Sequence, residues 1–225
     1  MLRNGPAFTT TQIDNFTIIR DDVLPGGTKR RALSKWLPQL KPDHFIYAGS
    51  VYGSGGWALA EACRDLGFKY TLALSKSDYR PHWLDLIDGK IIWHDPQPVD
   101  QIYQLYADEK GLLPLGYDDP LFKTCLADVF RETDIDPSEI WLPCVSGVLL
   151  QSAQIAWPDK KINTVCVAKN HGDIGNAIKY QALEKYHQPA RNPPPYPANA
   201  FSDAKLWQFI QQFALKDALI WNTSS

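Results

Sequence analysis

The sequence lacks the features that define several large protein classes. No apolar run approaches the roughly 18 residues that a membrane-spanning helix needs, and residues 1–11 lack the apolar core of a secretion signal. We therefore expect a cytoplasmic protein that does not enter a membrane. The chain has 23 basic and 25 acidic residues and a formal net charge of −2. Such a balance gives no broad positive field, which argues against general nucleic-acid binding.

Cysteine is scarce, and histidine is scattered. The four cysteines stand far apart in apolar stretches without a C-x-x-C pair, which predicts buried thiols and neither disulfides nor zinc. None of the five histidines has a histidine partner four residues away, so we expect no metal site. We interpret residues 170–173, Asn-His-Gly-Asp, as a polar turn. The whole chain is 44% hydrophobic and 21% charged, which is the composition of an ordinary globular protein.

Strand-like and helix-like segments alternate along the chain. The predicted strands are residues 16–20, 44–48, 70–74, 90–94, 139–144, 161–168 and 217–221, and the predicted helices are 30–40, 57–66, 99–110, 120–132, 148–156 and 204–214. Strand-loop-helix-strand units of this length imply right-handed crossovers between parallel strands. The pattern therefore predicts an α/β fold with a Rossmann-like parallel sheet and flanking helices.

A lysine follows a glycine turn at the end of the first predicted strand, in the run Asp21-Asp-Val-Leu-Pro-Gly-Gly-Thr-Lys29. A lysine amine must lose its proton before it can form an imine. Desolvation beside the cationic Arg30 and Arg31 would lower the pKa of Lys29 and favour the neutral amine. The alternative interpretation is a solvated lysine that follows a turn.

Four stretches, in their order along the chain, resemble the fold-type II pyridoxal-phosphate enzymes of the tryptophan synthase β family. Within that family the similarity is to aminocyclopropane-carboxylate deaminase and D-cysteine desulfhydrase. The first stretch, residues 19–33, resembles the signature R-x-D-D…G-G-N-K-x-R-x-L and implies that Lys29 forms the Schiff base with the cofactor. The second, residues 46–67, resembles the loop and helix that hold the substrate carboxylate and the cofactor ring. It implies substrate contacts at Tyr52, Gly53, Ser54 and Gly55, and it implies that Ser54 also contacts the cofactor.

The third stretch, residues 113–119 with 140–156, resembles the strand and glycine loop that take the cofactor phosphate. It implies phosphate contacts at Ser146, Gly147, Val148 and Leu149. Backbone N–H groups at a helix N-terminus suit an anion independently of any resemblance, although a glycine that only caps a helix is the alternative.

The fourth stretch, residues 202–207 with 218–225, resembles the closing helix and final strand of the family. It implies cofactor contacts at Asp203, near the pyridine nitrogen, and at Thr223. A helix-start residue is an equal account of Asp203.

The resemblance also implies an architecture and a reaction. Residues 1–40 and 112–225 would form a larger, cofactor-binding lobe, and residues 41–111 a smaller lobe that is reduced relative to the family. The expected cofactor is pyridoxal 5′-phosphate. The expected activity is that of a lyase or deaminase at the α-carbon of an amino acid or another small amine-bearing molecule. Relatives commonly pair, which leaves a homodimer open.

Two other functions remain open from the sequence. The run from Asp21 to Thr28 also resembles the D-D-x-x-x-T-G-G-T loop of phosphoribosyltransferases, in which paired acids contact a ribose, although this leaves Lys29 unexplained. The third hypothesis is a catalytically inactive binding protein with the pyridoxal-phosphate fold. Ser54 stands where the family has asparagine, and Ser202 stands where relatives have tyrosine, and both departures favour that hypothesis.

Overall fold

The computed structural model describes residues 6–168 and 172–225, so the predicted turn at 170–173 lies partly outside the described residues. The described strands are β1 (Thr10–Ile13), β2 (Phe16–Arg20), β3 (His44–Gly49), β4 (Lys69–Ser75), β5 (Lys90–His94), β6 (Glu139–Cys144), β7 (Lys161–Cys166), β8 (Ile178–Gln181) and β9 (Leu219–Asn222). The described α-helices are α1 (Gly27–Trp36), α2 (Gly55–Leu66), α3 (Val99–Gln104), α4 (Pro120–Arg131), α5 (Val148–Ala156) and α6 (Trp207–Phe213).

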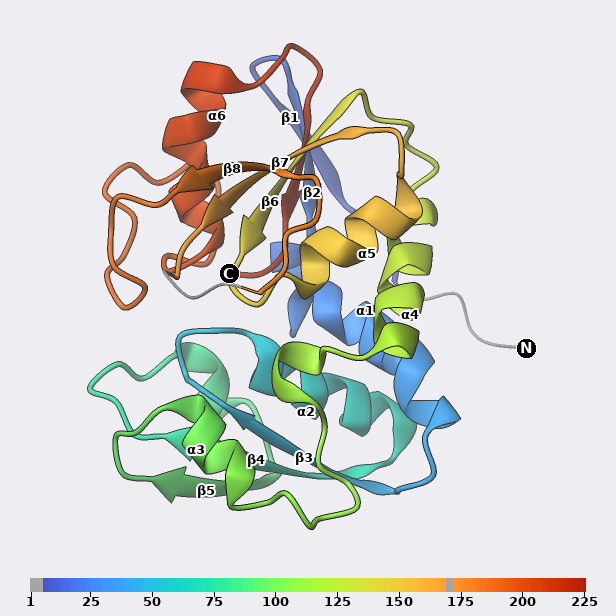
Figure 1. Ribbon diagram of the computed structural model, residues 1–225, viewed down its shortest axis with the longest axis vertical. Coiled ribbons are helices and arrows are strands. Elements are labelled where there is room, and N and C mark those ends of the chain that lie inside the picture. Colours follow the sequence, from blue (N-terminus) through green and yellow to red (C-terminus); the bar gives the residue numbers. More distant parts are fainter. Residues whose placement is uncertain (1–5, 169–171) are drawn as a thin grey trace.

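The larger sheet has, within the described residues, six strands in the order β1-β2-β9-β6-β7-β8. All neighbouring strands in it are parallel except the antiparallel pair β1 and β2. Figure 1 shows α6 on one side of this sheet and α1, α4 and α5 on the other. Side chains alternate between these layers: Ile140 and Leu142 of β6 share a core with α1, α4 and α5, whereas Trp141 packs with α6.

The smaller sheet contains the parallel strands β3, β4 and β5 in that order. Helix α2 covers one face and α3 covers the other. Phe45 and Tyr47 of β3 belong to the core that contains α2, and Ala48 packs with Ala73 and with Ile102 of α3. Both faces are therefore buried, as is usual for a parallel sheet.

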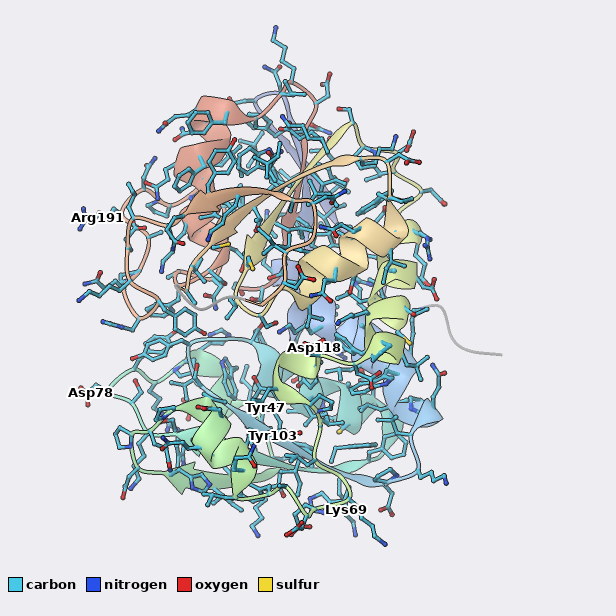
Figure 2. All side chains as sticks on the ribbon, viewed as in Figure 1. Tyr47, Lys69, Asp78, Tyr103, Asp118 and Arg191 are labelled. Carbon is cyan, nitrogen blue, oxygen red and sulfur yellow. The ribbon has the colours of Figure 1, made fainter. Side chains whose placement is uncertain are left out.

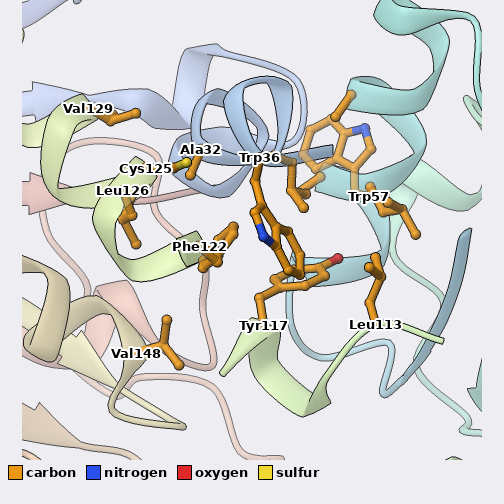
Figure 3. Close-up of a cluster of buried hydrophobic side chains, with 14 of the residues drawn as sticks. Ala32, Trp36, Trp57, Leu113, Tyr117, Phe122, Cys125, Leu126, Val129 and Val148 are labelled. Atoms are coloured by element: carbon orange, nitrogen blue, oxygen red, sulfur yellow. The ribbon is translucent and has the colours of Figure 1, made fainter. Parts of the chain in front are cut away.

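Helix α1 joins the two halves of the molecule, because it packs against both α2 and α4. Trp36 at its end meets Phe122 edge-on, with ring centroids 5.2 Å apart, and also contacts Tyr117 (Figure 3). At its start, Gly26 has a φ of 83°, and a methyl group there would lie 2.9 Å from Cα of Ala58. Glycine at this position therefore permits the close approach of α1 and α2.

The α/β class with a parallel sheet and flanking helices, predicted from the sequence, is confirmed. Several details differ, and among them the predicted helices 30–40 and 204–214 are α-helical only to Trp36 and from Trp207 to Phe213. Helix α1 begins at Gly27, so Lys29 lies in its first turn and not before it. Helix α3 ends at Gln104, short of the predicted residue 110, because the chain turns back to form a bridge between Leu112 and Ile46. The edge strands β1 and β8 were not predicted. The division into lobes at residues 40 and 112 stays a prediction.

All four cysteines are buried and free of disulfides. In the described parts of the chain, no helix has the length and apolar character needed to cross a lipid bilayer.

Candidate active site

A cavity of about 510 Å³ lies where three helices begin. The first turn of α1 contributes Lys29, the first residue of α2 contributes Gly55, and the start of α5 contributes Gly147 and Leu149. The remaining lining residues are Tyr47, Ala48, Gly49, Ser50, Gly53, Ser54, Val99, Leu115, Gly116, Pro143, Val145, Ser146, Gly172, Tyr186, Ser202, Thr223 and Ser224. Segments from the whole length of the chain therefore meet at one site.

Lys29 is the only charged side chain that lines this cavity among the described residues. Burial lowers the pKa of its amine from 10.5 to about 8, because the charged form loses solvation, and the nearby charge of Asp203 opposes that effect. The amine also lies 5.6 Å from the centroid of the Tyr117 ring. Near pH 8, a substantial fraction of Lys29 is thus neutral and able to act as a nucleophile or a base.

Buried polar contacts fix the turn that carries Lys29. The Asp21 carboxylate accepts hydrogen bonds from the Thr28 hydroxyl at 2.8 Å and from Arg31 Nε at 3.0 Å. The indole of Trp221 in β9 in turn donates to the Thr28 hydroxyl at 2.8 Å. Burial raises the pKa of Asp21, although Arg31 and Thr28 oppose the shift. These residues hold the start of α1 against the sheet.

The neighbouring acid, Asp22, is also held by hydrogen bonds within the protein. Asp22 forms two hydrogen bonds of 2.7 Å with the guanidinium of Arg20 and accepts a third, of 2.7 Å, from the amide of Asn222. Asp21 is 0% exposed and Asp22 is 7% exposed. Neither carboxylate lines the cavity, so the acid pair is not presented to a ribose.

The N-terminus of α5 provides a place for an anion. Gly147 precedes the helix with a φ of 86°, and a methyl group there would lie 2.3 Å from the backbone oxygen of Asp173. The N-cap residue is this glycine, which has no side chain to cap the helix, so the first N–H groups receive no hydrogen bond from it. Ser146, Gly147 and Leu149 line the cavity, whereas the side chain of Val148 is fully buried in the core that contains α1 and α4.

Asp203 lies directly behind the cavity wall. Its carboxylate accepts hydrogen bonds of 2.6 Å from the hydroxyl of Ser202 and from the backbone N–H of Thr223, and both partners line the cavity. It is 6% exposed, and burial raises its pKa from 3.8 to about 6. These contacts tie the start of the 3-10 helix at Asp203–Leu206 to the end of β9, which is more than a helix-start residue requires.

The predicted substrate residues fall into two groups. Gly53, Ser54 and Gly55 line the cavity. Tyr52 does not line it: the ring of Tyr52 stacks on Tyr79 with centroids 5.5 Å apart, and its hydroxyl pairs with that of Ser77 at 2.7 Å.

Two tyrosines of the cavity were missed in the sequence. Tyr47 stands in an apolar strand, where it resembles an ordinary core residue. Tyr186 stands in a segment without a regular pattern, and its hydroxyl bonds to the side chain of Ser50. The one available signal was the pair of glycines, Gly49 and Gly55, whose missing side chains leave room for the Tyr47 ring.

A second, larger cavity, of about 1020 Å³, lies between residues 40–46 and 108–114. Its lining includes none of the residues that the sequence analysis assigned to the cofactor or the substrate. The smaller cavity is the candidate active site because it combines a partly neutral amine with an uncapped helix N-terminus.

A pyridoxal-phosphate cofactor fits the residues present. A volume of about 510 Å³ is within the range of pockets that hold small molecules. The amine of Lys29 could bond to an aldehyde, the start of α5 could take a phosphate, and Asp203 lies behind Thr223 as an acid for a ring nitrogen. The described residues thus include a suitable group for the aldehyde, the phosphate and the ring nitrogen of the cofactor.

The arrangement of sheets and helices is that of the fold-type II pyridoxal-phosphate enzymes. Among solved structures, the chain is similar to a homologue of ACC deaminase, with a TM-score of 0.75 and 14% identity over 93% of this chain and 84% of that chain. It is also similar to a threonine deaminase from T.th. (TM-score 0.65, 12% identity, 93% and 86% covered) and to serine racemase from Dictyostelium discoideum (0.63, 13%, 96% and 91%).

The resemblance stated from the sequence is therefore confirmed at the level of the fold. At identities of 12–14%, what the chain shares with these structures is the fold. No family model matches the chain, and no similar sequence was found among curated proteins.

Proposed function

We propose that this protein is a pyridoxal-phosphate enzyme that acts as a lyase or deaminase at the α-carbon of an amino acid or amine. The observation that carries the proposal is the Lys29 amine, with a pKa of about 8, in a cavity that also receives the N-terminus of α5. The fold shared with deaminases and a racemase supports it.

Each part of the cofactor has a proposed partner. Lys29 would bond to the aldehyde carbon, and Ser146 with the N–H groups at the start of α5 would bind the phosphate. Asp203 and Thr223 would hold the ring nitrogen. When bound, the cofactor supplies an electron sink that stabilises negative charge at the α-carbon of the substrate.

Lys29 has a second proposed role, as the base that moves a proton at the substrate α-carbon. A base works best when its pKa is close to the working pH, and burial brings the pKa of Lys29 to about 8. The acid pair Asp21 and Asp22 is bound by Arg31 and Arg20. Because both carboxylates are already paired within the protein, they are not available to bind a ribose, which counts against the phosphoribosyltransferase alternative.

The first test is cofactor attachment. Purified protein incubated with pyridoxal phosphate should gain a visible absorption band. Borohydride should then fix the cofactor covalently on Lys29, and peptide mass spectrometry would identify the modified residue. Lys29→Ala should lose both the band and the covalent product, because no other described side chain on the cavity wall carries an amine.

Lys35→Ala is the matched control, since Lys35 lies on the same helix but pairs with Glu132 at the surface. It should attach the cofactor like the parent protein. Reduction that labels other lysines and spares Lys29 would contradict the proposal. Colourless protein that binds phosphoribosyl pyrophosphate would favour the phosphoribosyltransferase alternative. Colourless protein that binds neither compound would favour the inactive binding protein.

A further inference from the structure

The larger cavity, of about 1020 Å³, lies at the opposite end of β3 from the candidate active site. His44 and Phe45, at the start of β3, line the larger cavity, whereas Gly49, at its end, lines the candidate active site. The other walls come from residues 40–43, which lead from α1 into β3, and residues 108–114, which follow α3. The volume is that of a pocket for a small molecule.

Part of the lining of this cavity is apolar. The apolar lining residues include Trp36, Leu40, Phe45, Ile46 and Leu113. Trp36, Phe45 and Leu113 are buried, and none of the three is more than 3% exposed. Figure 3 shows Trp36 and Leu113 among the buried side chains of this region. A ring or an aliphatic body in the cavity would therefore be packed against apolar side chains and removed from water.

One of these side chains carries an unpaired hydrogen-bond donor. The indole N–H of Trp36 is buried, and within the part of the chain that the structure describes it has no hydrogen-bond partner. The ring is held in place, because it meets Phe122 edge-on at 5.2 Å and also contacts Tyr117. Buried donors are nearly always paired, and an unpaired one costs free energy. An acceptor on a molecule in the cavity would supply the missing partner.

The remaining lining carries an excess of negative charge. Carboxylates outnumber amines four to two among the described lining residues, with acids at Asp43, Asp108, Glu109 and Asp119 and bases at Lys41 and Lys110. Asp108 and Glu109 are adjacent in the sequence and exposed to solvent. A surface with this balance attracts cations and repels anions such as phosphates.

We infer that the larger cavity is a second ligand site, which binds a small cation that has an aromatic or aliphatic body and a hydrogen-bond acceptor. The body packs against Phe45 and Leu113, the acceptor takes the N–H of Trp36, and the positive group faces Asp108 and Glu109. The site is separate from the candidate active site and does not depend on the proposed function, since the two cavities share no described lining residue.

The test uses two probes that differ by one charge. The trimethylammonium derivative of phenylalaninamide has an aromatic ring, an amide oxygen and a fixed positive charge, and it cannot form an imine. The second probe, phenylpropanamide, has the same ring and amide without the charge. In calorimetric titration of the parent protein, the cation should bind at least about threefold more tightly, as expected for attraction by exposed carboxylates.

Trp36→Phe keeps a packed ring and removes the N–H, so it should weaken binding of both probes about 3- to 10-fold, the loss expected for one hydrogen bond. Trp57→Phe is the matched control. Trp57 is also buried and its indole N–H also lacks a partner among the described residues, but it lines neither cavity. This variant should bind the probes like the parent protein. Equal effects of the two substitutions would overturn the inference.

The double variant Asp108→Asn, Glu109→Gln tests the charge at two exposed positions, where the fold should tolerate substitution. The preference for the cation should fall toward equal binding of the two probes, and the affinity for phenylpropanamide should stay the same. An undiminished preference would overturn the choice of a cation. A parent protein that does not bind the cation at millimolar concentrations would overturn the site itself.

Lys29→Ala distinguishes the two cavities. This variant should bind the cation like the parent protein, because Lys29 lines only the smaller cavity. A loss of binding in Lys29→Ala would place the probe at the candidate active site and overturn the second site. The proposed function is tested by cofactor attachment at Lys29, so the two proposals fail separately.

Discussion

At the scale of single residues, burial is the main physical effect on the site. It lowers the pKa of Lys29 to about 8 and raises that of Asp203 to about 6. Both shifts favour the uncharged form of the group, since a charge loses its hydration inside the protein. The two groups interact, because the negative charge of Asp203 stabilises the protonated amine of Lys29.

Asp203→Asn should shift the pH dependence of cofactor attachment. The rate follows the neutral fraction of Lys29, so in the parent protein it should rise with pH and level off above about 8. Removing the negative charge of Asp203 removes an interaction that raises the pKa of Lys29. The rise should then occur at a lower pH, by roughly one pH unit or less. Stopped-flow absorbance across a pH series measures this, and a shift to higher pH would contradict the assigned interaction.

At the scale of elements, helix starts do most to shape the site, and each depends on a glycine or on an uncapped first turn. Gly147 is the clearest case, because its positive φ and its contact with Asp173 both exclude a side chain. The position of the first N–H groups of α5 depends on this turn.

Gly147→Ala should therefore weaken cofactor binding at least tenfold and destabilise the fold by about 1–2 kcal/mol or more. Equilibrium titration with pyridoxal phosphate and urea unfolding measure the two effects. Gly67→Ala is the control: Gly67 also has a positive φ, of 74°, but nothing lies within 4 Å of an added methyl group. That variant should lose about 1 kcal/mol of stability and keep its cofactor affinity. Equal affinities for the two variants would argue against a phosphate at α5.

The sequence predicts the buried elements well and the edge elements poorly. Strands β6 and β7 lie inside the sheet and are almost wholly buried, and each carries apolar residues that identify it as a strand. By contrast β1, Thr-Thr-Gln-Ile, and β8, Ile-Lys-Tyr-Gln, are short edge strands that are open to solvent. These strands are held by backbone hydrogen bonds to one neighbouring strand, and they lack a hydrophobic pattern from which they could be predicted. The same reasoning applies to the site, because Lys29 is marked by its glycine turn, whereas Tyr47 stands in a buried, apolar strand like any core residue.

At the scale of the whole molecule, one buried arginine holds several segments together. Arg31 on α1 pairs with Asp21 at 3.0 Å and donates to backbone oxygens of Pro6 and Ala7. Its guanidinium also lies 4.0 Å from the ring centroid of Phe8. One side chain thus fixes the N-terminal segment, the acid pair and the helix that bears the lysine.

Arg31→Met should destabilise the protein by about 3–5 kcal/mol at neutral pH, because it leaves the Asp21 carboxylate buried without its partner. Without Arg31 the pKa of Asp21 should rise further above its usual value. The loss of stability should therefore shrink as the pH falls through that raised pKa and the carboxyl becomes neutral. Urea unfolding at several pH values measures this. Arg191→Met, at the exposed position labelled in Figure 2, should change stability by less than about 0.5 kcal/mol. A pH-independent loss for Arg31→Met would contradict the explanation.

The abundance of glycine around the cavity has an evolutionary consequence. Six of the described lining residues are glycines, at positions 49, 53, 55, 116, 147 and 172, so much of the wall is peptide backbone, whose chemistry no point mutation alters. New selectivity in this scaffold would arise mainly from insertions and deletions that redirect the main chain. Directed evolution that randomises loop length should accordingly diversify the accepted compounds more than saturation mutagenesis of the wall.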